Sequence, residues 1–252
     1  MRPSPGSRSN WVRPTRVRDT GRRRKRTDRR LGEWGGWMSS SGGAGAVYDA
    51  YLAALVAGDR RRCWRLIESV VASGASLEVV HQDMIQKALY EVGDRWERNE
   101  LGVAEEHLAS HISEWIMGLL LPHYSPTERI GRLAVISCAQ GERHAIGPRM
   151  VADAMEVRGW DAIFLGADLP IGDLVRLTRV RRPDLVGVSI TTRAQVPAGR
   201  ELAREFAREF PDTPLVFGGQ ASAELRAQSA DRVHVCRTLG DLAGLLDEVE
   251  RT

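Results

Sequence analysis

The sequence predicts an α/β protein in which a five-stranded parallel sheet is preceded by a four-helix bundle. Residues 131–252 alternate short apolar runs with amphipathic segments, the pattern of strands and helices in a doubly wound parallel sheet. Residues 47–121 instead repeat apolar side chains at steps of three and four, as helices do. The 252 residues are enough for one large domain or two small ones.

Residues 1–46 show neither periodicity, and we predict a disordered basic tail there. Residues 1–37 hold 12 Lys and Arg against three acidic residues, which leaves 24 basic and 30 acidic residues in the rest. The Arg-rich run at 22–26 also suits the binding of nucleic-acid phosphates. A third interpretation is that Met38 is the true start. The acidic balance of the rest argues against nucleic-acid binding by the folded part.

The predicted bundle occupies residues 47–125. Its helices cover residues 47–57, 59–72, 76–96 and 103–121, followed by a linker over 122–127. Ser76 stands just before the third helix and is a suitable N-cap. Short helices with brief connections are typical of a small bundle.

The predicted sheet occupies residues 130–252. Its strands are Leu133–Ser137, Ala162–Leu165, Leu185–Ser189, Leu215–Phe217 and Val233–Cys236. The amphipathic segments are Ile146–Arg158, Ile171–Arg181, Pro197–Phe210, Ser222–Ala227 and Leu242–Glu250. Spacing does not give the strand order, and we expect the flavodoxin-like (Rossmann-like) order because it is common among five-stranded sheets of this kind.

Cysteine content and hydropathy bear on location. The three cysteines are far apart in the sequence and odd in number, which predicts no disulfide framework and a reducing, cytoplasmic setting. No apolar run reaches the ~18 residues that a membrane span needs, so no membrane partner is expected.

Three short motifs follow predicted strands at the same edge of the sheet. Glu142, His144 and Gly147 follow the first strand. After 41 further residues come Ser189 and Thr191, and after 26 more come Gly218 and Gly219. A loop histidine by itself is more often solvated than a metal ligand. Ligands of open α/β sheets bind at this edge, so the three motifs can face one ligand.

The spacing of these motifs resembles the cobalamin-binding domain of methionine synthase, cobalamin-dependent mutases and corrinoid methyl carriers. That family carries Asp-x-His-x-x-Gly, then Ser-x-Leu about forty residues later, then Gly-Gly. The resemblance implies that His144 is the lower axial cobalt ligand, and that Arg143, Ala145 and Ile146 bind the cofactor in the same loop. It also implies that Ser189, Thr191, Gly218 and Gly219 line a slot for the nucleotide tail. Glu142 replaces the family's Asp, and Thr191 replaces its Leu.

The bundle carries a second resemblance. Trp96, nine further residues, then Glu106 and His107 resemble the CarH-type cobalamin-dependent photoreceptors, in which the tryptophan packs against the 5′-deoxyadenosyl group. This implies adenosylcobalamin as the cofactor and the four-helix bundle as its cap. The alternative is that Trp96 belongs to the bundle core, with Glu106 and His107 at a solvated helix start.

The photoreceptor resemblance has limits. Those proteins carry a MerR-like DNA-binding domain, which this sequence does not show, and Glu97 stands where they can have a second histidine. The photocobilins, which pair cobalamin with a bilin, are also similar. A bound biliverdin would need cations for its propionates, and Arg143, Arg149 and Arg193 are the candidates.

We therefore predict a cobalamin-binding light sensor rather than an enzyme. It is expected to signal through bundle movement or a change of oligomer, as a homo-oligomer with an unknown protein effector. The first alternative is a corrinoid methyl carrier of a methyltransferase system. A cobalamin store or a nucleotide-binding flavodoxin-like domain is a plainer alternative. Mutase chemistry is not predicted, because the chain lacks a large substrate barrel.

Overall fold

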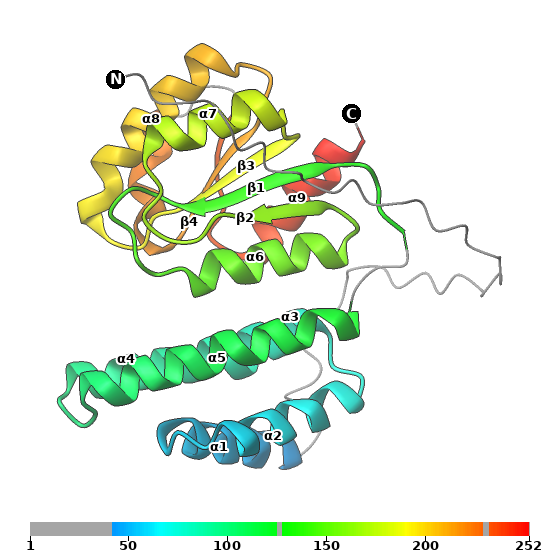
Figure 1. Ribbon diagram of the computed structural model, residues 1–252, viewed down its shortest axis with the longest axis vertical. Coiled ribbons are helices and arrows are strands. Elements are labelled where there is room, and N and C mark those ends of the chain that lie inside the picture. The colour runs from blue at the N-terminus through cyan, green and yellow to red at the C-terminus, as the bar shows by residue number, and fades with distance from the viewer. Residues whose placement is uncertain (1–41, 125–127, 229–231, 252) are drawn as a thin grey trace, which may run out of the picture.

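The computed structural model describes residues 42–124, 128–228 and 232–251. Figure 1 shows a layer of helices lying beside an α/β layer, with helix α6 (Ile146–Val157) between the sheet and the helical layer. The predicted fold is confirmed. The sheet has five parallel strands in the order β2-β1-β3-β4-β5, which is the flavodoxin-like order.

The helical bundle contains four helical rods. Its elements are α1 (Gly42–Val56), α2 (Arg60–Ala72), α3 (Leu77–Val79), η1 (Val80–Gln86), α4 (Lys87–Glu97) and α5 (Val103–Tyr124). The elements α3, η1 and α4 form one continuous rod, because the residues at both junctions keep helical dihedral angles. The middle of this rod, η1, is a wider π-helix. Ser76 caps the rod as predicted, since its side chain accepts a hydrogen bond from the Val79 backbone at 3.3 Å.

Two boundaries of the bundle differ from prediction. Helix α1 begins at Gly42, so residues 42–46 are helical rather than part of a tail, while residues 1–41 lie outside the described residues. Helix α5 runs through Pro122 to Tyr124, where a linker was expected. Pro122 sits in the last turn, and the Tyr124 hydroxyl donates to the Ala75 carbonyl at 2.8 Å, which anchors that turn. Residues 125–127 of the predicted linker lie outside the described part.

The α/β layer follows the predicted alternation. Its strands are β1 (Leu133–Cys138), β2 (Asp161–Phe164), β3 (Leu185–Ser189), β4 (Leu215–Gly218) and β5 (Val233–Val235). Its further helices are α7 (Ile171–Arg181), η2 (Arg193–Gln195), α8 (Val196–Glu209), η3 (Gln220–Gln228) and α9 (Leu239–Glu250). The predicted segment at 222–227 is a 3₁₀ helix, and α9 begins earlier than predicted because Thr238 and Asp241 form a capping box.

Each face of the sheet has its own core. Helices α7 and α8 cover the face that includes Val186, Val188 and Phe217. Helices α6 and α9 cover the opposite face, which includes Ala134, Ile136, Trp160 and Val216.

Helix α6 joins the two layers. Met155 on α6 packs against the sheet, whereas Met150 on the same helix is buried in the core of the bundle. The core of the bundle therefore includes a residue of the helix that follows the His144 loop. None of the helices in the described ranges has the length and hydropathy needed to cross a membrane.

Candidate functional site

The loop between β1 and α6 presents His144 on a buried carboxylate. Glu142 is 1% exposed, and its Oε1 lies 2.5 Å from the His144 Nδ1. The same oxygen accepts a hydrogen bond from the His144 backbone at 2.9 Å, and Oε2 accepts one from the Thr191 backbone at 2.7 Å. The His144 side chain is otherwise 68% exposed. The histidine is thus fixed on one side of its ring and open on the other.

Glu142 is held as a carboxylate. Burial alone would raise the pKa of Glu142, but hydrogen bonds from the backbones of His144 and Thr191 and from the His144 ring outweigh it and lower that pKa. With Glu142 ionised, Nδ1 of His144 carries the proton of their hydrogen bond, and in the neutral form of the imidazole Nε2 then has a lone pair. Carboxylate-oriented histidine is a common arrangement for metal ligands, so these residues fit a cobalt-bound corrin.

Two residues that the sequence did not single out brace this loop. The Gly141 backbone donates to the Asp168 carboxylate at 2.7 Å, and the Asp168 backbone donates to the Glu142 carbonyl at 2.8 Å. The Gln195 side chain donates to the Gly141 carbonyl at 3.0 Å. Asp168 has a positive φ of 51°, which suits its place in a tight loop. A polar residue after the second strand was the available signal for Asp168.

Ser189 and Gly218 lie side by side at the carboxyl edge of the sheet. Ser189 pairs in register with Cys138 of β1 on one side and with Gly218 of β4 on the other. Because side chains alternate along a strand, all three share the face that α6 and α9 cover. The three residues of this row, Cys138, Ser189 and Gly218, are all small.

Gly219 follows this row with a left-handed φ of 90°. A Cβ atom at this position would lie 2.4 Å from the Ile190 carbonyl oxygen, so a side chain has no room there. Glycine is therefore required by both the dihedral angle and the close approach of the neighbouring backbone. Thr191 contributes its backbone to Glu142, as described above.

The far ends of α6 and α9 are clamped together. Arg158, just after α6, donates to Glu250 at 3.0 Å and to Asp247 at 2.6 Å. The Trp160 ring nitrogen also donates to Glu250, at 2.8 Å. The clamp therefore joins the two helices at their carboxyl ends.

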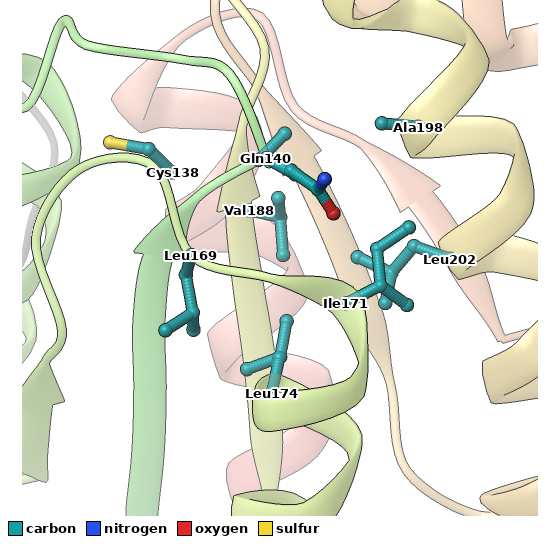
Figure 2. Close-up of a pocket in the computed structure, with 9 residues that line it drawn as sticks. Cys138, Gln140, Leu169, Ile171, Leu174, Val188, Ala198 and Leu202 are labelled. Atoms are coloured by element: carbon teal, nitrogen blue, oxygen red, sulfur yellow. The ribbon is translucent and has the colours of Figure 1, made fainter.

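A small hollow lies on the opposite face of the sheet. Figure 2 shows Leu174, Val188 and Leu202 lining it, together with Gln140 from the β1–α6 loop. Its volume is about 10 Å³, enough for one water molecule. This hollow lies on the α7 and α8 side, so it is not the face that Ser189 and Gly218 occupy.

The predicted residues of the bundle cluster around the α4–α5 connection. Trp96, near the end of α4, is 45% exposed, so the interpretation of Trp96 as a core residue is wrong. In the first turn of α5, Glu106 lies 2.6 Å from the His107 ring and accepts a hydrogen bond from Ser110 at 3.0 Å. Figure 1 shows the α4–α5 connection and the β1–α6 loop at the same end of the molecule.

The three arginines suggested for a bilin have different surroundings. Arg193 pairs with Glu224, whereas the Arg149 guanidinium lies beside Gly118 of α5. Arg143 is exposed in the loop before His144. A separate open hollow of about 470 Å³ lies on the outside of the bundle. It is lined by Gly58, Asp59, Arg60, Arg61, Leu108, His111, Ile112 and Trp115.

Comparison with known proteins matches both halves of the chain. Residues 47–121 and 132–245 each match a family model described as a B12 binding domain. The chain is 29% identical over 187 residues to the HTH-type transcriptional repressor CarH of Myxococcus xanthus, an alignment that covers 74% of this chain and 62% of that protein. It is 25% identical over 128 residues to monomethylamine corrinoid protein 1 of Methanosarcina mazei, which covers 49% of this chain and 58% of that protein.

The solved structure of the Methanosarcina barkeri monomethylamine corrinoid protein has the same fold. It superposes with a TM-score of 0.69 at 18% identity and covers 81% of this chain and 99% of that chain. The chain spans less than two thirds of the two curated relatives named above. Taken together, the matches support cobalamin binding. With a B12 binding domain matched in each half, the chain belongs to the B12-binding family.

Proposed function

We propose that this protein is an adenosylcobalamin-binding light sensor. The observation that carries the proposal is the exposed Trp96, with the paired Glu106 and His107, at the same end of the molecule as the His144 loop. The exposed part of the Trp96 side chain, 45% of its surface, is free to cover the outer face of a cofactor held by His144. The similarity to a repressor named CarH supports the same conclusion.

In this proposal His144 binds cobalt through Nε2, and Glu142 keeps the proton on Nδ1. When bound, adenosylcobalamin supplies a light-labile bond between cobalt and carbon. Trp96 shields the adenosyl side from water, and Glu106 with His107 forms the polar border of that side. Ser189, Thr191, Gly218 and Gly219 line the slot for the nucleotide tail, while Arg143, Ala145, Ile146 and Gly147 contact the corrin from the His144 loop.

The signal is a movement of the bundle against the α/β layer. Met150 of α6 is buried in the bundle core, so a movement of the bundle would change the packing around α6. We propose that this changes the oligomer or exposes a surface to a protein effector in the cytoplasm, without catalysis by this chain.

A methyl carrier is the second candidate, and the similarity to a monomethylamine corrinoid protein favours it. A carrier must expose the upper face of its cobalt to a methyltransferase. In this proposal Trp96 and the Glu106–His107 pair cover the side from which such a partner would approach, which favours the sensor. Free exchange of methyl groups with a methyltransferase would favour the carrier.

Illumination separates the two candidates. The full chain is loaded with adenosylcobalamin in the dark, its spectrum and hydrodynamic size are recorded, and both are recorded again after blue light. The sensor predicts release of the adenosyl group together with a change in size, and Trp96→Ala should uncouple the two. A light-stable complex, or photolysis with no change in the protein, would exclude the sensor. His144→Ala tests the shared core, because an unchanged cobalamin spectrum would exclude His144 as ligand.

Biliverdin as a second ligand is favoured by the hollow on the outside of the bundle. Arg60 and Arg61 line this open hollow and can pair with two propionates, and the Arg60 guanidinium lies 4.8 Å from the centre of the Trp115 ring. Biliverdin titration should then give a red-absorbing complex that Arg60→Ala weakens. Equal binding by the wild type and Arg60→Ala would exclude this hollow.

A further inference from the structure

A histidine and an aspartate face each other across the contact between the bundle and the α/β layer. His81 of η1 is 1% exposed and Asp153 of α6 is 6% exposed. The His81 Nε2 lies 3.8 Å from the Asp153 Oδ2, just beyond hydrogen-bonding distance. Neither nitrogen of His81 nor this oxygen of Asp153 has a hydrogen-bond partner in the described part of the chain. Buried polar atoms without partners are rare and costly, so this pair calls for an explanation.

The backbone around the pair has an unusual geometry. His81 lies in the first turn of η1, and π-helical turns within α-helices are frequent at functional positions. Asp153 lies on α6, the helix that starts just after His144. The two residues therefore join the layer that carries Trp96 to the helix that carries the His144 loop.

Burial shifts the pKa values of His81 and Asp153 in opposite directions. Burial, with a smaller effect of Arg149, lowers the pKa of His81 to about 4. Burial raises the pKa of Asp153 to about 6, which Arg149 partly opposes and Glu156 reinforces. Besides His81, η1 carries one titratable residue, Asp83. From α5, the residue beside Arg149 is Gly118, which has no charge. Both members of the pair are therefore most stable uncharged when the layers are packed.

We propose that His81 and Asp153 form a latch between the bundle and α6, in which a proton rests on Asp153 while the layers are packed and on His81 when they separate. In the packed state the Asp153 hydroxyl donates toward the lone pair on Nε2 of His81. On separation water reaches both groups, the O–H bond of Asp153 breaks and an N–H bond forms on His81. No proton is gained or lost, and a neutral pair becomes two hydrated charges.

The latch makes packing nearly independent of pH. In water His81 and Asp153 return toward their ordinary pKa values of 6.5 and 3.8. Between about pH 4 and pH 6 the packed pair holds one proton, on Asp153, and the separated pair also holds one, on His81. Because the two states bind the same number of protons, pH does not shift their equilibrium in this window.

Single substitutions should make packing of the two layers depend on pH, in opposite directions for the two residues. In Asp153→Asn, the remaining His81 binds its proton more tightly when separated, so packing weakens as pH falls from 6.5 to 4. In His81→Gln, the remaining Asp153 binds its proton more tightly when packed, so packing weakens as pH rises from 3.8 to 6. In each single variant the equilibrium constant between packed and separated layers should change by up to about tenfold per pH unit. In the double variant this constant should again be independent of pH.

Amide hydrogen exchange in the full chain measures these equilibria. Opening constants of η1 and α6 are followed from pH 4.5 to 6.5, after correction for the intrinsic pH dependence of exchange. Amides of β3 provide an internal control, and Asp173→Asn on the exposed side of α7 is a matched carboxylate control. In η1 and α6 the opening constants of the two variants should change with pH in opposite directions. The opening constants of β3, and those of the control variant, should match the wild type. Neither cobalamin nor light is needed, so this test does not depend on the proposed function.

Three results would overturn the latch. The pH dependence of the opening constants could have the same sign in both variants, could equal that of the wild type, or could be equally large in β3. A measurement on the wild type keeps the proposal testable if a variant does not fold. In an NMR titration of the packed protein, the His81 ring, identified by its contacts to α6, should stay neutral down to about pH 5. Titration of that ring near pH 6.5 would contradict the proposal.

Discussion

Glu142 holds His144 at two points, because one carboxylate oxygen accepts hydrogen bonds from both the ring and the backbone of the histidine, at 2.5 Å and 2.9 Å. Its other oxygen accepts from the Thr191 backbone at 2.7 Å. The side chain that orients the candidate ligand therefore also ties the loop after β1 to the loop after β3.

Glu142→Gln should weaken cobalamin binding by about 10-fold to 100-fold, the usual effect of losing a residue that orients a metal ligand. A glutamine has one acceptor oxygen, so its amide group would face a backbone N–H. Titration followed by absorbance measures the affinity. Glu224→Gln, which removes a carboxylate paired with Arg193 on the surface, should bind like the wild type. Equal affinity of both variants would contradict the role given to Glu142.

Gly219→Ala should destabilise the fold by about 3 kcal/mol, from the left-handed dihedral angle together with the steric clash. Its new Cβ would lie 2.4 Å from the Ile190 carbonyl oxygen. Gly74→Ala is the matched control, because Gly74 has a φ of 89° and nothing within 4 Å of an added Cβ. It should cost about 1 kcal/mol, from the dihedral angle alone. Urea unfolding measures both, and equal costs would show that the close approach at Gly219 is unimportant.

Trp96→Ala should leave stability within about 1 kcal/mol of the wild type, as expected for a surface position. Its effect should appear instead in the photolysis and affinity of adenosylcobalamin. Trp160→Ala provides the contrast, because Trp160 is 0% exposed and its loss should cost about 3 to 5 kcal/mol. Thermal unfolding without cofactor measures both. A large loss of stability in Trp96→Ala would mean that Trp96 serves the fold rather than a ligand.

Glu250→Gln should destabilise the protein by about 1.5 to 3 kcal/mol, because Arg158 loses a charged hydrogen-bond partner that also receives the Trp160 ring N–H. The exposed Glu68→Gln on α2 is the control and should change stability by less than about 0.5 kcal/mol. Urea unfolding is again the measurement. A wild-type midpoint for Glu250→Gln would show that the clamp between α6 and α9 contributes no stability.

Local patterns in the sequence were enough to predict the elements of the fold. The alternation of apolar runs and amphipathic segments predicted all five strands, because strands buried between helix layers are mostly apolar. The ends of elements were predicted less accurately where a contact with a residue distant in the sequence decides them. Helix α5 continues to Tyr124 because its hydroxyl reaches Ala75, a residue 49 positions earlier.

Motif spacing was sufficient to predict which residues lie at the carboxyl edge of the sheet, because it places Glu142, His144, Ser189 and Gly218 at strand ends. The contacts among these residues became known from the packed fold. It set Glu142 against the Thr191 backbone, braced the loop with Asp168, left Trp96 exposed and placed His81 against Asp153. This difference arises because periodicity reports which face of an element is apolar, whereas burial and hydrogen bonding depend on which elements pack together.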